Sequence, residues 1–230
     1  MTRTQIGFAA ALAAGLAFVL FPGLDLMFSG LFYSEATNFV LRGRPLATFF
    51  NDAVSNTATI SSAALILGLV ATLALRRSIA GLGARHFVFM ILCVAIGPGL
   101  IANSLFKEHW GRARPRNVVE FGGPSTFTPP LVIADQCATN CSFVSGDAAQ
   151  GFVYTALAFV VPRRRRRAVM AGGLTFGSLV GLERIMQGAH FLSDVIFAGL
   201  VVVASVYALN WLVLEDGWRI LLNRVFPRPG

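Results

Sequence analysis

Residues that could handle a phosphate group gather at three points of an otherwise apolar chain. The first point holds Lys107 and Arg114, the second is the run 145–147, and the third extends from Arg184 to Asp194. Lys107 is the only lysine in the sequence. Ionisable groups are costly near hydrocarbon, so at the ends of membrane helices they usually mark a functional site. We interpret the three points as one phosphate-binding site at a membrane surface.

The cationic side chains suit the oxygen atoms of a phosphate group. Arg114 and Arg184 each offer a planar fork of N–H donors, and Lys107 offers a point charge. Ser145-Gly146 begins a predicted helix, where free backbone N–H groups and the helix dipole favour an anion. Each of these residues alone is more often an interfacial cation or an ordinary helix cap. Their combination is what predicts a phosphate site.

A histidine and an aspartate form the reactive part of the pattern. His190 and Asp194 are four residues apart, the spacing of one helical turn. The carboxylate can then accept a hydrogen bond from one ring nitrogen and leave the other nitrogen free. An imidazole oriented in this way can attack phosphorus and give a phosphohistidine, which water then hydrolyses. We therefore expect His190 to be the nucleophile.

The composition indicates an integral membrane protein. Hydrophobic residues make up 55% of the 230 residues and charged residues 13%, and the mean hydropathy is +0.68. A soluble domain would be about a quarter charged. The net charge of +8 does not indicate a nucleic-acid partner, because the arginines occur in short clusters between apolar runs. That pattern is typical of the charges that set membrane topology.

The apolar runs predict an all-α fold with one domain over residues 1–230. Residues 24–56 are expected to form an interfacial segment, and residues 106–145 a loop without long helices. Gly97-Pro98-Gly99 predicts a kink. Six transmembrane helices are expected, at residues 6–20, 58–75, 87–105, 146–161, 168–182 and 191–214.

Six crossings place both termini on one side of the membrane. The positive-inside rule makes that side cytoplasmic, because the arginine clusters fall on it. The same count puts all three points of the candidate site on the opposite side. The basic residues assigned to the cytoplasmic side are Arg3, Arg76, Arg77, Arg85, the run 163–167, Arg219, Arg224 and Arg228.

The three cysteines divide into two kinds. Cys93 lies in an apolar run and is expected to be a small buried hydrophobe. Cys137 and Cys141 are four apart in the polar loop. They form a disulfide if the loop faces an oxidising compartment, and otherwise stay as thiols. A zinc site is not expected, because this loop lacks the further ligands.

The three points together resemble the signature of the type 2 phosphatidic acid phosphatase superfamily. The chain matches it with Lys107-x6-Arg114-Pro115, then Ser145-Gly146, then Arg184-x5-His190-x3-Asp194. The resemblance implies a phosphatase of the bacterial inner membrane that needs no metal or cofactor and has its site on the periplasmic face. The implied substrate is a membrane lipid phosphate, such as lipid A or undecaprenyl pyrophosphate.

The resemblance also implies roles for individual residues. His190 would be the nucleophile and Asp194 its partner. The implied phosphate ligands are Lys107, Arg114, Ser145, Gly146 and Arg184.

Two positions depart from the family pattern. Asp147 stands where the family has a histidine that protonates the leaving group, and Glu183 stands where it has a serine. Asp147 could still be the acid if burial favoured its protonated form, although nearby cations favour the ionised form. Alternatively, His109 or Glu183 supplies the proton, or the leaving group is good, as in an anomeric phosphate or a pyrophosphate. We expect a good leaving group, with Asp147 as an auxiliary acid.

Other functions fit the same residues less well. A phosphotransferase would use the same phosphoenzyme and pass the phosphoryl group to a lipid or sugar acceptor. A catalytically inactive relative would bind a lipid phosphate without cleaving it. A transporter is disfavoured, because the charges lie at helix ends and the chain shows no paired repeats. The expected partners are the bilayer and the lipid substrate.

Overall fold

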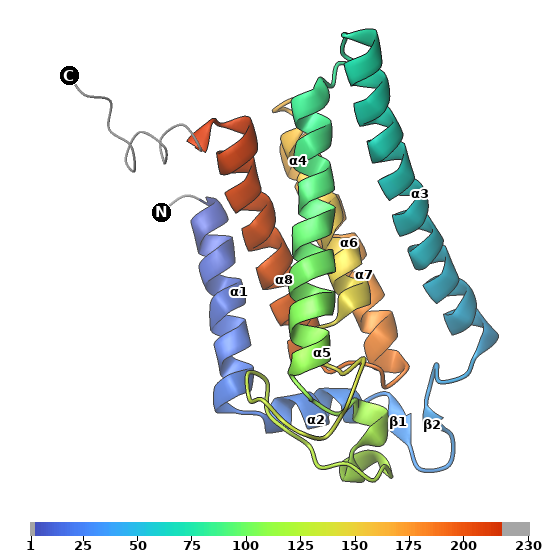
Figure 1. The fold of residues 1–230 in the computed structure, drawn as a ribbon. Coiled ribbons are helices and arrows are strands. Elements are labelled where there is room, and N and C mark those ends of the chain that lie inside the picture. The colour runs from blue at the N-terminus through green and yellow to red at the C-terminus, as the bar shows by residue number, and fades with distance from the viewer. Residues whose placement is uncertain (1–2, 218–230) are drawn as a thin grey trace.

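The computed structural model describes residues 3–217, apart from the side chains of residues 3–6 and 8. The expected cytoplasmic placement of the C-terminal arginines therefore lies outside the described residues, and the side chain of Arg3 is not described. Long helices lie side by side and form the body of the molecule (Figure 1). They are α1 (Arg3–Leu20), α3 (Pro45–Leu75), α4 (Ala84–Val94) with its continuation η1 (Ala95–Phe106), α7 (Arg166–Met186), and α8 (Leu192–Leu209) with its continuation η5 (Asn210–Leu214).

Not every helix is long enough to cross a membrane. Four described segments are long and apolar enough: 45–75, 84–109, 166–186 and 192–214. A fifth candidate joins the end of α1 to α2 (Gly23–Gly30) through a bend of 98°. The helical stretch formed by α6 (Gly146–Phe152) and the 3-10 helix η4 (Val153–Phe159) is shorter. The protein is thus mostly helical with four to five candidate spans, and a sixth crossing stays a prediction.

Two helix boundaries differ from those expected. The second long helix begins at Pro45 rather than at Ala58. Proline suits the first turn of a helix, where no backbone N–H donor is required, so the helix starts before its apolar stretch does. The third extends beyond Leu105 through α5 (Lys107–His109). Lys107 therefore stands on a helix end rather than in a loop.

At the expected kink, Pro98 lies inside the π-helix η1. Proline has no N–H to donate and disturbs the regular helical ladder. Over η1 two side chains help to satisfy the backbone carbonyls. Asn103 Nδ2 donates to the carbonyl of Pro98 at 2.8 Å, and Ser104 Oγ donates to that of Gly99 at 3.2 Å. The helix thus continues through the proline and still delivers Lys107 to its end.

Glycines let α6 approach α7 closely. A Cβ atom on Gly151 would lie 2.7 Å from the Cα atom of Gly177. Close approach of small residues is a common way to pack helices in membranes. On its other side α6 packs against α8, and Ala148, Phe152 and Val202 belong to the same buried core. α6 is therefore held between α7 and α8.

A cap of short elements and loops covers one end of the bundle (Figure 1). Its buried centre is the aromatic cluster of Phe39, Phe121 and Phe191. The expected ordered loop contains only the short 3-10 turns η2 (Pro115–Asn117) and η3 (Val119–Phe121) after α5. The remaining parts of the cap are α2 and an antiparallel hairpin of β1 (Tyr33–Ser34) and β2 (Asn38–Phe39).

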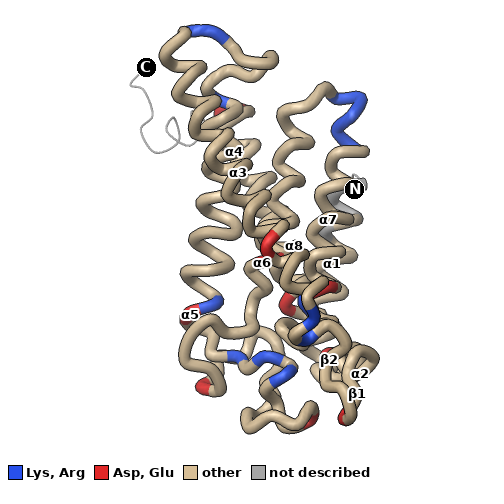
Figure 2. The backbone as a smooth tube through the Cα atoms, turned by 90° about the vertical axis from the view of Figure 1, so that its right-hand side faces the viewer, with Lys and Arg blue, Asp and Glu red and all other residues tan. Residues whose placement is uncertain are grey.

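Of the two states predicted for the cysteines of the polar loop, the structure contains the disulfide. Cys137 and Cys141 form a disulfide in the cap. Cys93 is a buried free thiol in the core. Basic segments at the end of α3 and the start of α7 lie at the opposite end of the bundle (Figure 2). The molecule therefore has one end with basic turns and one end with the cap.

Candidate active site

Backbone hydrogen bonds bring the three predicted points together. The segment 141–145 runs between the other two. At its start the N–H of Cys141 donates to the carbonyl of Lys107 at 3.1 Å. At its end the N–H of Ser145 donates to the carbonyl of Asp194 at 3.2 Å. The phosphate-binding candidates and the histidine-aspartate pair thus occupy one region under the cap.

His190 is fully buried with one ring nitrogen held and the other free. Its Nδ1 lies 2.7 Å from the backbone carbonyl of Ser142. A carbonyl oxygen can only accept, so Nδ1 carries the proton and Nε2 carries the lone pair. Nε2 has no hydrogen-bond partner in the described part of the chain. The neutral ring therefore has its Nε2 lone pair free of any hydrogen bond from the described residues.

The electrostatic surroundings favour the neutral form of His190. Burial lowers the pKa of the imidazole below its ordinary value of 6.5, and the charges of Arg184 and Arg114 lower it further. The nearby Asp194 carboxylate opposes this shift. At neutral pH the ring therefore keeps the lone pair that an attack on phosphorus requires.

Asp194 does not make the hydrogen bond predicted from its spacing. Its Oδ2 lies 3.7 Å from His190 Nδ1. The carboxylate instead accepts from the backbone N–H of Phe191 at 2.8 Å, which caps the start of α8, and from Ser142 Oγ at 2.5 Å. The same oxygen therefore serves the helix cap and Ser142 and lies beyond hydrogen-bond distance of the ring. Asp194 thus acts on His190 through its charge and by fixing Ser142, whose carbonyl orients the imidazole.

Arg112 is a buried residue that sequence reasoning missed. Its side chain is fully buried, with Nη1 donating to Asp194 Oδ1 at 2.5 Å and Nη2 donating to Asp25 Oδ2 at 2.8 Å. Its guanidinium also lies 4.4 Å from the ring centre of Phe191. Arg112 therefore supports the site through Asp194, because both of its terminal nitrogens are used by buried carboxylates.

Asp25 was missed as well, and it joins α2 to the active region. Its Oδ1 accepts from the N–H of Ser193 at 2.9 Å, and its Oδ2 accepts from Ser193 Oγ at 2.5 Å. The available signal was an acidic residue in an apolar stretch. Buried charges persist where they are paired, so such a residue predicts a cationic partner.

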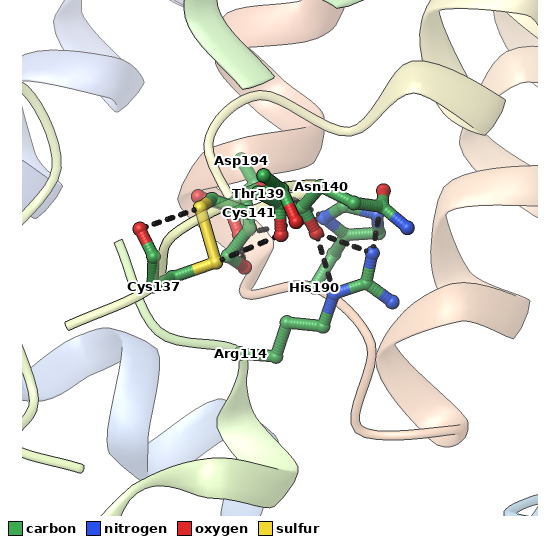
Figure 3. Close-up of a disulfide and its surroundings, with 8 residues drawn as sticks. Arg114, Cys137, Thr139, Asn140, Cys141, His190 and Asp194 are labelled. Atoms are coloured by element: carbon green, nitrogen blue, oxygen red, sulfur yellow. Dashed lines mark hydrogen bonds and ion pairs between the residues drawn. A yellow bond between two sulfur atoms is a disulfide. The ribbon is translucent and has the colours of Figure 1, made fainter. Parts of the chain in front are cut away.

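Arg114 is buried next to the disulfide loop. Only 9% of the residue is exposed. Its Nη2 donates to the carbonyl oxygen of Asn140 at 2.7 Å and to Asn140 Oδ1 at 2.9 Å. Figure 3 shows the Arg114 side chain beside His190. Burial lowers the pKa of Arg114 to about 10, so the guanidinium is still cationic at neutral pH.

Arg184 lies between the two residues that depart from the family pattern. Its Nε forms an ion pair of 2.9 Å with Asp147 Oδ2. Its Nη1 donates to Gln187 Oε1 at 2.9 Å, and Gln187 Nε2 donates to Glu183 Oε1. The other Glu183 oxygen is buried and has no hydrogen-bond partner among the described residues. Asp147 and Glu183 are thus both linked to Arg184.

The start of α6 brings a cation to a helix end. Ser145 Oγ accepts from the N–H of Ala148 at 3.3 Å and caps the helix. A Cβ atom on Gly146 would lie 3.3 Å from Lys107 Nζ and 2.3 Å from Asn103 Oδ1. Lys107 therefore reaches the free N–H groups at the first turn, which suit an anion. A side chain at this position would require Asn103 to move.

His109 is the candidate with the weakest link to this cluster. It is exposed on α5, and its Nδ1 lies 3.1 Å from the carbonyl of Leu105 in the same helical stretch. Within residues 3–217, no three His, Cys, Asp or Glu side chains form a group that could hold a metal ion.

Comparison with known proteins gives the family. A family model described as the PAP2 superfamily matches residues 86–218. The chain belongs to the PAP2 superfamily. This confirms the resemblance in the motifs, and it makes the protein a phosphatase. With its apolar helices, the chain is a multi-pass bacterial membrane protein.

Several curated relatives are lipid A phosphatases. The lipid A 4'-phosphatase of Francisella tularensis subsp. novicida (strain U112) is 36% identical over 219 residues, which cover 90% of this chain and 95% of the relative. That of Rhizobium leguminosarum is 44% identical over 119 residues, about half of each chain (50% and 51%). A lipid A 1-phosphatase of Rhizobium etli is 37% identical over 146 residues, 57% of each chain. No solved structure matches the chain.

Proposed function

We propose that this PAP2 protein hydrolyses a phosphate monoester of lipid A through a phosphohistidine at His190. The observation that carries the proposal is the buried imidazole whose Nδ1 is held by the Ser142 carbonyl while Nε2 is free. A free, neutral ring nitrogen next to cationic phosphate ligands is the arrangement that nucleophilic phosphoryl transfer requires. Lipid A is proposed because one relative, matched over 95% of its own length and 90% of this chain, is a lipid A phosphatase.

We further propose the 4' position as the site of cleavage. The relative matched over nearly its full length is a 4'-phosphatase, whereas the 1-phosphatase of R. etli matches over 57% of its length. Position 1 of a sugar is anomeric and position 4' is an ordinary alcohol, which is a poorer leaving group. This choice replaces the good leaving group favoured by the sequence, and it makes an acid catalyst more important.

In the first step the phosphate binds among the cations. Lys107, Arg114 and Arg184 neutralise its charge, and we propose no metal for this role. Nε2 of His190 attacks phosphorus, and the bond to the lipid oxygen breaks. The phosphohistidine carries positive charge on the ring, which the Asp194 carboxylate at 3.7 Å stabilises.

Asp147 is proposed to move the protons of both steps. In the free protein its ion pair with Arg184 favours the carboxylate. A bound phosphate competes for Arg184 and brings negative charge, and both effects favour the protonated acid. Asp147 then protonates the leaving alcohol. In the second step the Asp147 carboxylate takes a proton from the attacking water, the bond from Nε2 to phosphorus breaks, and inorganic phosphate leaves.

We propose one domain with six crossings in the bacterial inner membrane, both termini in the cytoplasm and the cap in the periplasm. In support, basic turns lie at the end opposite the cap (Figure 2), as the positive-inside rule requires. The disulfide in the cap also suits an oxidising compartment. The sixth crossing would be the helix at 146–159, lengthened by the arginine run that follows it. Residues 24–44 would lie in the membrane interface.

The test is phosphate release from lipid A by purified protein in detergent with a chelator present. Fragmentation mass spectrometry of the product shows whether the 4' or the 1 phosphate is lost. We expect loss of the 4' phosphate, no activity in His190→Ala, and ordinary activity in the control His86→Ala. A phosphorylated acceptor without free phosphate would indicate a transferase instead. Binding of lipid A without any reaction would indicate an inactive relative.

A further inference from the structure

Asn140 is an exposed residue that makes three contacts with a buried cation of the site. Its backbone carbonyl accepts from Arg114 Nη2 at 2.7 Å and from Nε at 3.2 Å, and its Oδ1 accepts from Nη2 at 2.9 Å. Asn140 has a φ of +52°, which most residues avoid and asparagine tolerates. This backbone conformation lets one residue present two acceptors to the same guanidinium.

The Cys137–Cys141 disulfide closes a small loop around Asn140 (Figure 3). Cys141 is buried, and its N–H is bound to the carbonyl of Lys107. Residues 138–140 are exposed, so they gain little from packing. A disulfide restricts the conformations of a short loop whose side chains make few packing contacts. The disulfide to Cys137 therefore limits how far Asn140 can move from Arg114.

The acceptors that Asn140 offers are neutral, and this matters for the charge of the site. The ion pairs among the described residues do not include Arg114. Neutral oxygens fix the direction of the guanidinium without cancelling its positive charge. A carboxylate in the same place would compete with the phosphate for it. Arg114 is thus oriented in advance while its charge is available to an anion.

We propose that Asn140 is a positioning residue for Arg114 and that the disulfide keeps it in place, so that full phosphate affinity requires the oxidised loop. This inference rests on the proposed function, because it assumes that Arg114 binds the substrate phosphate. Its direct readout is nevertheless the binding of inorganic phosphate, which can be measured even if no lipid is hydrolysed.

The first experiment uses Asn140→Gly, which keeps the backbone carbonyl and tolerates positive φ but removes the side-chain acceptor. Thr139→Ala is the matched control in the same loop. We expect Asn140→Gly to weaken the binding of inorganic phosphate, measured by calorimetry, by about tenfold, and to lower kcat/KM by a similar factor. This is the size of effect that the loss of a hydrogen bond to a charged group produces. Thr139→Ala should match the unaltered protein. Equal behaviour of the two variants would overturn the role of Asn140.

The second experiment reduces the loop. A dithiol such as dithiothreitol transfers two electrons and two protons to the Cys137–Cys141 bond, giving two thiols, and becomes a cyclic disulfide itself. Phosphate affinity should fall in the unaltered protein and recover on reoxidation. The double variant Cys137→Ser/Cys141→Ser should be weak from the start and insensitive to the dithiol. Cys93 is present in both proteins, so a response in both would assign the effect to Cys93 and overturn the proposal.

The third experiment asks whether the loop acts through Arg114. In an Arg114→Ala background, reduction should cause no further loss of phosphate affinity. An equal loss in both backgrounds would show that the loop acts elsewhere and would overturn the proposal. If the oxidised protein hydrolyses no lipid phosphate yet phosphate binding follows the predicted pattern, the proposed function fails while the positioning role stands.

Discussion

Asp147 on α6 and Arg184 on α7 form an ion pair, with 2.9 Å between Oδ2 and Nε. Glu183 is linked to the same arginine through Gln187. The two departures from the family pattern therefore meet at one arginine, the proposed phosphate ligand Arg184, although they are far apart in the sequence. In the proposed mechanism Arg184 also binds the substrate phosphate, which couples phosphate binding to the protonation of Asp147. Four predictions follow from this and from the other contacts of the site.

Asp147→Asn keeps the shape of the side chain and removes its ability to donate and accept a proton. We expect kcat to fall by about 10² to 10⁴-fold, the usual contribution of a general acid–base group. Asp147→His should retain part of the activity, since histidine can also transfer protons. The measurement is phosphate release from lipid A across pH. If Asp147→Ala keeps full activity at every pH while His109→Ala loses it, His109 is the acid.

The activity should persist below the pH at which an ordinary histidine is protonated. The reactive form of His190 is neutral, and burial lowers its pKa below 6.5. As the pH falls from 8 to 6.5, protonation of His190 should therefore lower kcat/KM by less than half. The main decline should come at lower pH. A profile of kcat/KM against pH checks this. A midpoint above 6.5 on the acidic side would contradict the assignment.

Arg112→Ala should destabilise the protein strongly. It leaves the buried carboxylates of Asp25 and Asp194 without their common cation, and breaking a buried ion pair in this way costs about 3–5 kcal/mol. The control is Arg85→Ala, which removes a half-exposed pair with Asp216 and should cost no more than about 1 kcal/mol. Thermal unfolding in detergent compares the two. Similar losses in both variants would contradict the central role of Arg112.

Gly146→Ala should lower the activity through a steric effect at the start of α6. The new methyl group would meet Asn103 Oδ1 at 2.3 Å and lie 3.3 Å from Lys107 Nζ. We expect a decrease in kcat/KM of about tenfold or more, because small displacements at a reacting centre are costly. Adding Asn103→Ala should recover part of the loss by making room. No recovery would mean that the N–H groups of the helix start, rather than crowding, are responsible.

The motif residues could be predicted from the sequence because their chemistry and spacing are local. His190 and Asp194 are separated by four residues, and Lys107 and Arg114 belong to one short stretch. Composition likewise predicts a helical membrane protein, since the bilayer requires long apolar helices. The helix boundaries were less predictable. Pro45 starts α3 ahead of its apolar region, and α5 extends the next long helix beyond Leu105.

Only the tertiary structure shows how these groups are held. Arg112 and Arg114 look alike in the sequence, yet one is fully occupied by Asp25 and Asp194 while the other is oriented by the neutral acceptors of Asn140. The sequence indicates His190 as the candidate nucleophile, whereas the fold decides that the Ser142 carbonyl, rather than Asp194, accepts the hydrogen bond from its Nδ1. The reason is physical. Residue types and short spacings determine which reactions are possible, but the partner of a buried polar group depends on which distant segments the chain packs beside it.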